Sequence, residues 1–196
     1  MTVAGAVVAV VRPLVFTDRL DEVRDELAGL GLHPREESIA GGWVDLAGEG
    51  GLVALHSAAG ADQPTAEGET WLSFEVADAD AAADRLRAAG FGDALVTDEA
   101  YGREVRVATP DAGLLRIAEV KHDRYGFRGD RSVAGSGVVL AEVPTGDPAG
   151  WEPLLGALGL DAGDDGVSFG DRRSGIVRLV PGRPTAYVGA RLRVVT

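Results

Sequence analysis

The 196-residue sequence contains no cysteine, and this absence excludes disulfide bridges, thiolate catalysis and sulfur-ligated metal sites. Aromatic residues make up only 6% of the chain, so alanine, valine and leucine must fill most of the interior. Hydrophobic residues still amount to 45%, which is enough for a sizeable core. The length fits one large or two small domains.

Basic residues are also scarce, with 19 Lys and Arg against 31 Asp and Glu, and the net charge is −12. Binding to phosphate groups needs a surplus of cations, so this balance argues against nucleic acid and against anionic membrane surfaces. An acidic chain attracts cationic small molecules. A solvated acidic surface explains the charge more simply.

Long hydrophobic runs are missing as well. The stretch from Val3 to Val11 is too short to span a bilayer, and no basic residue precedes it as in a signal peptide. We interpret residues 7–17 as a first strand and expect a cytoplasmic protein.

What the chain does contain is a threefold internal repeat. Three helical stretches end at Gly31, Gly90 and Gly159, each in the position of a left-handed helix stop. Similar closing strands begin at Gly51, Gly113 and Gly175, which are spaced 62 residues apart. The similar opening strands are LVFTD (14–18), FEVAD (74–78) and AEVPT (141–145). Each unit therefore reads as a strand, a helix and further strands, which predicts an α+β fold.

The repeats divide the chain into segments. Two full βαβββ modules are expected at 7–60 and 69–120, together occupying residues 1–122. The charged, glycine-rich stretch 123–136 is expected to be a linker. Residues 137–196 then form a third, shortened module with a lone terminal strand at 185–195.

The second unit carries a family resemblance. FEVADADAAADRLRAAG (74–90), followed by the TPDAG turn (109–113), resembles the vicinal oxygen chelate superfamily, which includes glyoxalase I, extradiol dioxygenases and bleomycin-resistance proteins. The resemblance covers 7–120 well and 137–196 more weakly. It implies that two modules form a cup-shaped mixed sheet with helices outside, and that a ligand, often with a metal, sits in the cup.

The resemblance also implies where metal ligands would lie. The matching positions hold Val11, Leu55, Trp71 and Ile117, none of which can ligate a divalent ion. We therefore expect neither a metal nor another cofactor. His56 lies one residue past a ligand position, so strand alternation should turn it away from the cup to the surface or rim; the alternative is a role as ligand or base. His33 and His122 are expected in solvated segments.

The strand at 71–76 predicts the binding face. Alternation places Leu72, Phe74 and Val76 against the helix. The opposite face carries Trp71, Ser73 and Glu75, and an aromatic plate beside a carboxylate suits a flat or cationic guest. The alternative for Glu75 is an internal salt bridge to Arg106 or Arg116.

Three further residues are candidates for the same site. Trp43 is either a cup-wall aromatic or a plug between helix and sheet. Tyr101 is expected on a hairpin rim, from which it could close over a ligand. Glu119 either lines the cup mouth or is an exposed strand end.

Three functions remain open from the sequence. The first is a metal-free binding protein of the bleomycin-resistance type, which sequesters an aromatic or cationic small molecule, confers antibiotic resistance and acts as a homodimer. The second is an enzyme of the same superfamily (lyase, isomerase or dioxygenase) with displaced or no metal ligands, or with Glu75 as a base. The third is a structural or regulatory role, with the third unit covering the cup.

Overall fold

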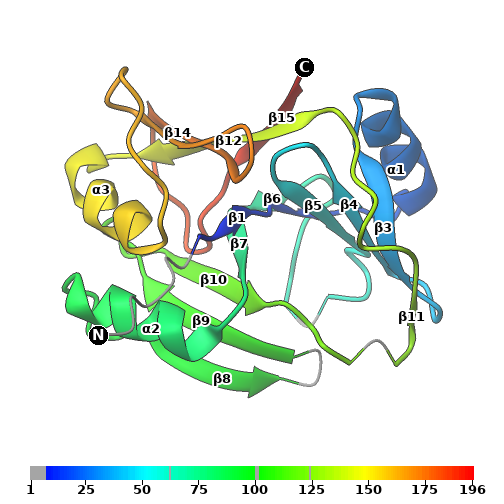
Figure 1. Cartoon of the computed structure of the whole chain (residues 1–196), viewed down its shortest axis with the longest axis horizontal. Coiled ribbons are helices and arrows are strands. Elements are labelled where there is room, and N and C mark those ends of the chain that lie inside the picture. The colour runs from blue at the N-terminus through cyan, green and yellow to red at the C-terminus, as the bar shows by residue number, and fades with distance from the viewer. Residues whose placement is uncertain (1–7, 62, 100–101, 124) are drawn as a thin grey trace.

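The computed structural model describes residues 8–61, 63–99, 102–123 and 125–196. The chain forms two larger sheets and one smaller sheet, and each repeat unit supplies a helix (Figure 1). The helices are α1 (Leu20–Gly29), α2 (Ala79–Ala88) and α3 (Pro148–Ala157). The expected α+β fold of strand–helix–strand modules is confirmed.

The first large sheet has five strands in the order β1-β7-β10-β9-β8. Most of it comes from the second unit, and α2 covers its outer face. Its strands are β1 (Val10–Val11), β7 (Ser73–Val76), β8 (Leu95–Glu99), β9 (Gly102–Ala108) and β10 (Leu114–Glu119).

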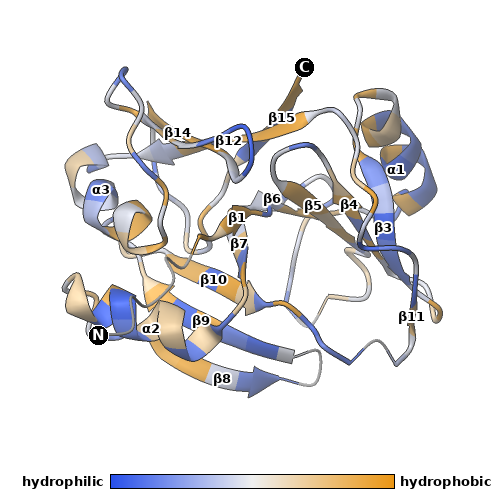
Figure 2. Cartoon of the chain, in the orientation of Figure 1, coloured by the Kyte–Doolittle hydropathy of each residue, from blue (hydrophilic) through white to orange (hydrophobic). Residues whose placement is uncertain are grey.

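The second large sheet has six strands in the order β11-β3-β4-β5-β2-β6 and packs against α1. Figure 2 shows hydrophobic residues along its central strands β4 and β5, while α1 mixes hydrophobic with hydrophilic residues. Its strands are β2 (Leu14–Phe16), β3 (His33–Ser38), β4 (Trp43–Ala47), β5 (Leu52–His56), β6 (Thr70–Trp71) and β11 (Phe127–Arg128).

The opening strands of the first two units are exchanged between these sheets. β1 pairs with β7 of the second unit, whereas β2 pairs with β5 of its own unit and with β6 of the second. The single strand predicted over 7–17 is therefore two strands in different sheets, and Val7 lies outside the described residues. Pro13 separates them because it has no N–H to donate to a ladder.

The three predicted helix stops are confirmed. Gly31, Gly90 and Gly159 each follow the C-cap residue of a helix and have φ of 94°, 103° and 83°. Only glycine adopts this left-handed conformation without strain from a Cβ atom.

The third unit forms a four-stranded sheet in the order β13-β14-β12-β15. It packs on the other two sheets through backbone hydrogen bonds from Ala9 N to Leu158 O (2.9 Å) and from Val139 N to Gly50 O (2.8 Å). One strand lies between its helix and its closing strand, as expected. The strands are β12 (Val138–Thr145), β13 (Ser168–Asp171), β14 (Gly175–Pro181) and β15 (Arg191–Val195).

The C-terminal segment differs from the expected strand at 185–195. Only residues 191–195 form a strand, paired with β12. Residues 182–190, here called the strap, cross the gap where β6 and β7 part. Ala186 O accepts a hydrogen bond from Leu114 N (2.8 Å) and Val188 O accepts one from Leu72 N (2.7 Å). The strap therefore links the two large sheets.

Residues 123–136, expected as a linker, contribute β11, which pairs with β3. None of the helices in the described residues has the length and apolar character of a membrane span.

Candidate binding site

A cavity of about 520 Å³ lies between the two large sheets. Both sheets, the segment 121–131 and Tyr187 of the strap contribute to its wall, and the described residues of α1 and α2 do not. Strands of the two sheets carry most of the side chains that face the cavity.

Aromatic side chains form one part of this wall. Trp71 stacks on Tyr187 with ring centroids 4.1 Å apart and an interplanar angle of 12°, and its other neighbour is Phe16 at 4.5 Å. Trp43 meets the His56 ring edge-on at 5.6 Å. Phe16 and Trp71 are only 3% and 4% exposed, so the partly exposed rings of Trp43, His56 and Tyr187 are the ones that a planar molecule can reach.

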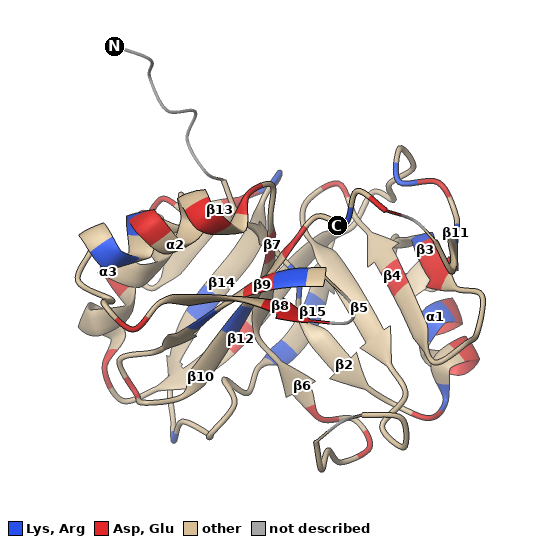
Figure 3. Ribbon diagram, turned by 90° about the horizontal axis from the view of Figure 1, so that it is seen from below, with Lys and Arg blue, Asp and Glu red and all other residues tan. Residues whose placement is uncertain are grey.

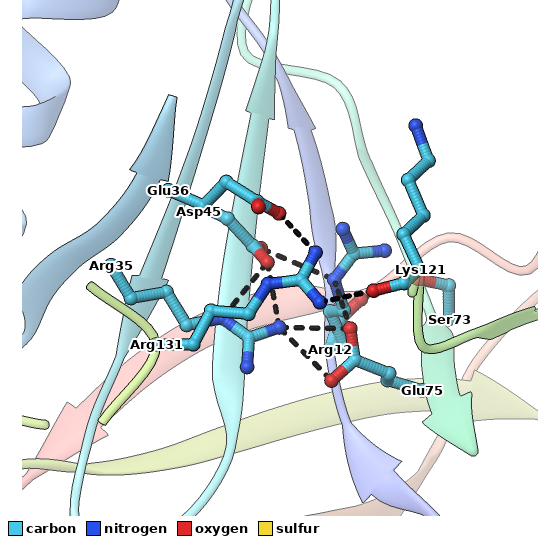
Figure 4. A network of polar contacts seen from close by, with 8 residues as sticks. All are labelled: Arg12, Arg35, Glu36, Asp45, Ser73, Glu75, Lys121 and Arg131. Carbon is cyan, nitrogen blue, oxygen red and sulfur yellow. Dashed lines mark hydrogen bonds and ion pairs between the residues drawn. The ribbon is translucent and has the colours of Figure 1, made fainter. Parts of the chain in front are cut away.

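A buried network of four charged residues lies beside the aromatic region (Figure 4). Arg35 donates to Asp45 Oδ2 (2.8 and 3.0 Å) and to both oxygens of Glu75 (2.8 and 2.9 Å). Arg12 Nε donates to Asp45 Oδ1 at 3.1 Å and lies 3.9 Å from Glu75 Oε2. We call Arg12, Arg35, Asp45 and Glu75 the charge quartet; its two positive and two negative charges balance.

The quartet connects the two large sheets, since Glu75 comes from β7 and Arg35 and Asp45 come from β3 and β4. Burial acts to lower the pKa of Arg35, but the charges of Asp45 and Glu75 outweigh it and raise that pKa above its ordinary value. Ser73 donates a hydrogen bond to the carbonyl oxygen of Arg12.

A second ionic cluster lies on β9 and β10. Glu104, only 2% exposed, accepts from Arg106 Nε (2.6 Å) and from Arg116 Nη2 (2.8 Å). Figure 3 shows charges of both signs on β8 and β9 beside the space between the sheets.

Among the described residues of the wall the formal charges cancel, although the protein carries −12. Six of these residues are basic: Arg12, Arg103, Arg106, Arg116, Lys121 and Arg131. Six others are acidic: Glu36, Asp45, Glu75, Glu99, Glu104 and Glu119. The cavity is therefore not an extension of the acidic surface.

Two cations in the wall keep donor atoms available. Arg12 lies over the Trp43 ring at 5.2 Å, and no described residue accepts a hydrogen bond from its Nη1 or Nη2. Lys121 Nζ lies 4.4 Å from the centroid of the Phe127 ring, with no carboxylate of the described residues within ion-pair distance. Burial lowers the pKa of Lys121, and the charges of Arg12 and Arg131 lower it further against the attraction of Glu36 and Asp45.

The structure brings most of the predicted site residues together. Trp71, Ser73, Glu75, Trp43 and Glu119 all lie in the cavity wall, and Tyr101 lies outside the described residues.

Several of their interactions differ from expectation. Glu75 pairs with Arg35, not with Arg106 or Arg116, so both of its oxygens are engaged and it is not a carboxylate awaiting a cationic guest. Glu119 accepts from Ala79 N (2.8 Å) at the start of α2 and pairs with Arg103 (3.3 Å).

The expected facing of three other positions is wrong. Val11, Leu55 and Ile117 are fully buried in the core and do not line the cavity, whereas their neighbours Arg12, His56 and Arg116 do. At these three positions the side chain that faces the cavity is one residue later than expected, and a shift of one residue in a strand moves every side chain to the opposite face.

His56 is therefore a wall residue and does not point away. Its Nδ1 lies 2.7 Å from Ser57 O, and because a carbonyl oxygen only accepts, Nδ1 carries the proton. His33 and His122 are exposed, although His33 begins β3 and is not a loop residue.

The wall does not fit the metal that the resemblance implies. The side chains that face the cavity near the four positions include two guanidinium groups and an indole, which cannot ligate a divalent cation. Within the described part of the chain, no three His, Asp or Glu side chains gather as a metal site requires.

The residues missed from the sequence are Arg12, Arg35, Asp45, Lys121 and Tyr187. Most of them carry no local signal, because their partners are distant in the chain. Lys121 could have been recognised from the sequence, because it is the only lysine beside 18 arginines.

No family model matches the sequence, and a search of curated proteins found no match. Solved structures do match. A catechol 2,3-dioxygenase is 16% identical with a TM-score of 0.58, covering 95% of this chain and 74% of its own. A triple mutant of 4-hydroxymandelate synthase from Streptomyces coelicolor is 15% identical with a TM-score of 0.57, covering 97% of this chain and 71% of its own.

A third match is a fusion of a xylose isomerase-like TIM barrel with a 4-hydroxyphenylpyruvate dioxygenase, 14% identical with a TM-score of 0.55. It covers 95% of this chain, which spans 36% of the fusion protein's length. At these identities the likeness is one of fold. The chain has the vicinal oxygen chelate fold that its second unit resembles.

Proposed function

We propose that this protein binds a small, planar organic anion in the cavity between its two large sheets, without the help of a metal. The observation that carries the proposal is the pairing of aromatic walls with two cations, Arg12 and Lys121, whose donor atoms the described residues leave available. A cavity of about 520 Å³ has the size of a small-molecule site.

The charge of the ligand follows from which groups are already engaged. Glu75 gives both oxygens to Arg35, and Asp45 is held by Arg35 and Arg12. A cationic guest would have to displace a buried ion pair, which costs several kcal/mol. An anion can instead accept hydrogen bonds from Arg12 Nη1 and Nη2 without disturbing the quartet.

The planar shape follows from the rings. Trp43 and His56 meet edge-on, and Tyr187 stacks on the buried Trp71, which leaves Trp43, His56 and Tyr187 as the partly exposed rings of the wall. Offset stacking on such rings favours flat molecules. Two of the fold neighbours are named for catechol and for 4-hydroxyphenylpyruvate, both of which are aromatic.

The test compares two probes of similar shape and opposite charge by isothermal titration calorimetry: 2-naphthoate and 2-naphthylmethylammonium. We expect the carboxylate to bind and the ammonium to bind at least about tenfold more weakly, a difference of about 1.4 kcal/mol. Binding of the carboxylate should be unchanged after treatment with EDTA. Tighter binding of the ammonium, or carboxylate binding that needs added metal, would contradict the proposal.

A pair of variants locates the site. Trp43→Leu removes a ring from the wall and should weaken carboxylate binding about tenfold. Tyr125→Leu is the matched control, because Tyr125 is 93% exposed and does not line the cavity. Equal affinities of the two variants would place the ligand elsewhere.

A further inference from the structure

Lys121 differs from the other basic residues in its chemistry and lies in the cavity wall. Every other basic residue except histidine is an arginine, 18 in all, and the single lysine lies in the cavity wall. Arginine is always charged and cannot act as a nucleophile, whereas a lysine that loses its proton can. The one amine side chain of the protein is therefore placed where a ligand would meet it.

The charged form of the amine has no ion-pair partner among the described residues. Its Nζ lies 4.4 Å from the centroid of the Phe127 ring, a contact that attracts an ammonium group, but none of the described carboxylates lies close enough for an ion pair. Four charged groups act on it from the neighbouring elements: Glu36 on β3, Asp45 on β4, Arg12 after β1, and Arg131.

The two carboxylates among these groups are already engaged. Asp45 is held by Arg35 and Arg12, and Glu36 pairs with Arg131. Their attraction for Lys121 is therefore largely offset by the arginines beside them. Burial is the first cause that lowers the pKa of Lys121, and the repulsion from Arg12 and Arg131 acts in the same direction. More of the amine is neutral at neutral pH than for an exposed lysine.

We propose that Lys121 captures a carbonyl group of the ligand as an imine. The Nζ lone pair attacks the carbonyl carbon, and a C–N bond forms as the C=O bond becomes a C–OH. Loss of one water from this carbinolamine leaves the C=N bond, and no oxidant or reductant is needed. The ligand class is then a planar organic anion that also carries an aldehyde or ketone, with its acid group held by Arg12. This inference rests on the proposed function and specifies its ligand.

Reductive trapping tests the inference on the full chain. The protein is incubated with 4-carboxybenzaldehyde and sodium cyanoborohydride, which converts an imine to a stable secondary amine, and the adduct is located by intact mass and peptide mapping. With one lysine in the chain, the N-terminal amine is the only competing amine, and the peptide map separates the two. We expect one adduct per folded chain at Lys121, formed at least about tenfold faster than in guanidinium-unfolded chain, because binding positions the aldehyde beside the amine.

Controls separate this inference from the proposed function. Benzaldehyde, which lacks the acid group, should label Lys121 more slowly, and 2-naphthoate should protect it. Lys121→Arg and Lys121→Gln should both lose the adduct, and Lys121→Arg should still bind 2-naphthoate by calorimetry.

Each failure has its own meaning. Labelling of Lys121 at the same rate in folded and unfolded chain overturns the inference, and the proposed function stands if 2-naphthoate still binds. If both aldehydes label the folded chain fast and 2-naphthoate does not slow the labelling, Lys121 is a reactive amine but the proposed anion site is wrong.

Discussion

Glu75 shows how a single buried carboxylate can hold two sheets together. It lies on β7 and accepts two hydrogen bonds from Arg35 on β3, and only 9% of its surface is exposed. Replacing it with glutamine removes one negative charge and leaves Arg12 and Arg35 with Asp45 alone. Loss of one partner from a buried ion pair costs about 3–5 kcal/mol.

We therefore expect Glu75→Gln to lower the free energy of unfolding by about that amount in urea denaturation. Glu142→Gln is the control, because Glu142 pairs with Arg193 at 3.3 Å and the Arg193 side chain is 58% exposed. Such surface pairs contribute about 1 kcal/mol or less. Equal losses in the two variants would show that the quartet does not stabilise the fold.

Trp71 lines the cavity and is also part of the buried hydrophobic core. Its indole is 4% exposed, lies between Phe16 and Tyr187, and donates from Nε1 to Glu69 at 2.7 Å. The sequence alone predicts that Trp71→Ala weakens ligand binding at least tenfold and leaves the fold intact. The structure changes the second half of that prediction, because truncating a buried tryptophan to alanine costs about 3–5 kcal/mol.

Urea denaturation and calorimetry with 2-naphthoate measure both effects on the same variant. We expect a loss of stability of that size and, among the molecules that remain folded, affinity reduced about tenfold. A variant that keeps the parent's stability would mean that the strap and Phe16 close over the space left by the indole.

Among the elements, the contact between the first and third units leaves no room for a side chain at Gly50. A Cβ atom on Gly50 would lie 1.8 Å from the carbonyl oxygen of Arg172, a separation that requires the backbone to move. We expect Gly50→Ala to destabilise the protein by about 1–3 kcal/mol or more, as overpacking does. Thermal unfolding measures the change.

Gly156→Ala is the matched control in α3. A Cβ atom there meets nothing within 4 Å, and alanine is favoured over glycine in a helix by about 0.5–1 kcal/mol. The two substitutions should therefore shift the melting temperature in opposite directions. A Gly50→Ala variant with the melting temperature of the parent would show that the third unit can shift away from the first.

For the molecule as a whole, acid should weaken the contact between the second and third units. Asp111 lies between β9 and β10 and accepts from Gly146 N (3.0 Å) and Trp151 Nε1 (2.9 Å), with Thr145 Oγ1 as a third donor. Burial acts to raise the pKa of Asp111, but these hydrogen bonds lower it below its ordinary value.

A carboxyl group with a lowered pKa in the folded state stabilises the protein when ionised. Its contribution is complete above the unfolded pKa of about 4 and is lost as pH falls through the folded pKa. Asp111→Asn should therefore cost about 1 kcal/mol at pH 7, after solvent screening is allowed for, and the difference from the parent should shrink below about pH 4. Urea denaturation across this range tests it; a difference that stays constant with pH would show that the charge of Asp111 is not involved.

The features readable from the sequence were those that depend on neighbours along the chain. The 62-residue repeat, the glycine stops at Gly31, Gly90 and Gly159, and the cavity-facing set of Trp71, Ser73 and Glu75 follow from local periodicity and backbone conformation. These patterns were enough to predict the fold class and one wall of the cavity.

The features that depend on pairing between distant segments came from the folded chain. Which way Val11 or Leu55 points depends on the strand it pairs with, and a shift of one residue exchanges core for cavity. The partner of Glu75 is 40 residues away, and Pro13 divides the opening strand between two sheets. The charge of the proposed ligand likewise rests on which side chains of the cavity wall neutralise one another. These ion pairs form only when both large sheets have come together.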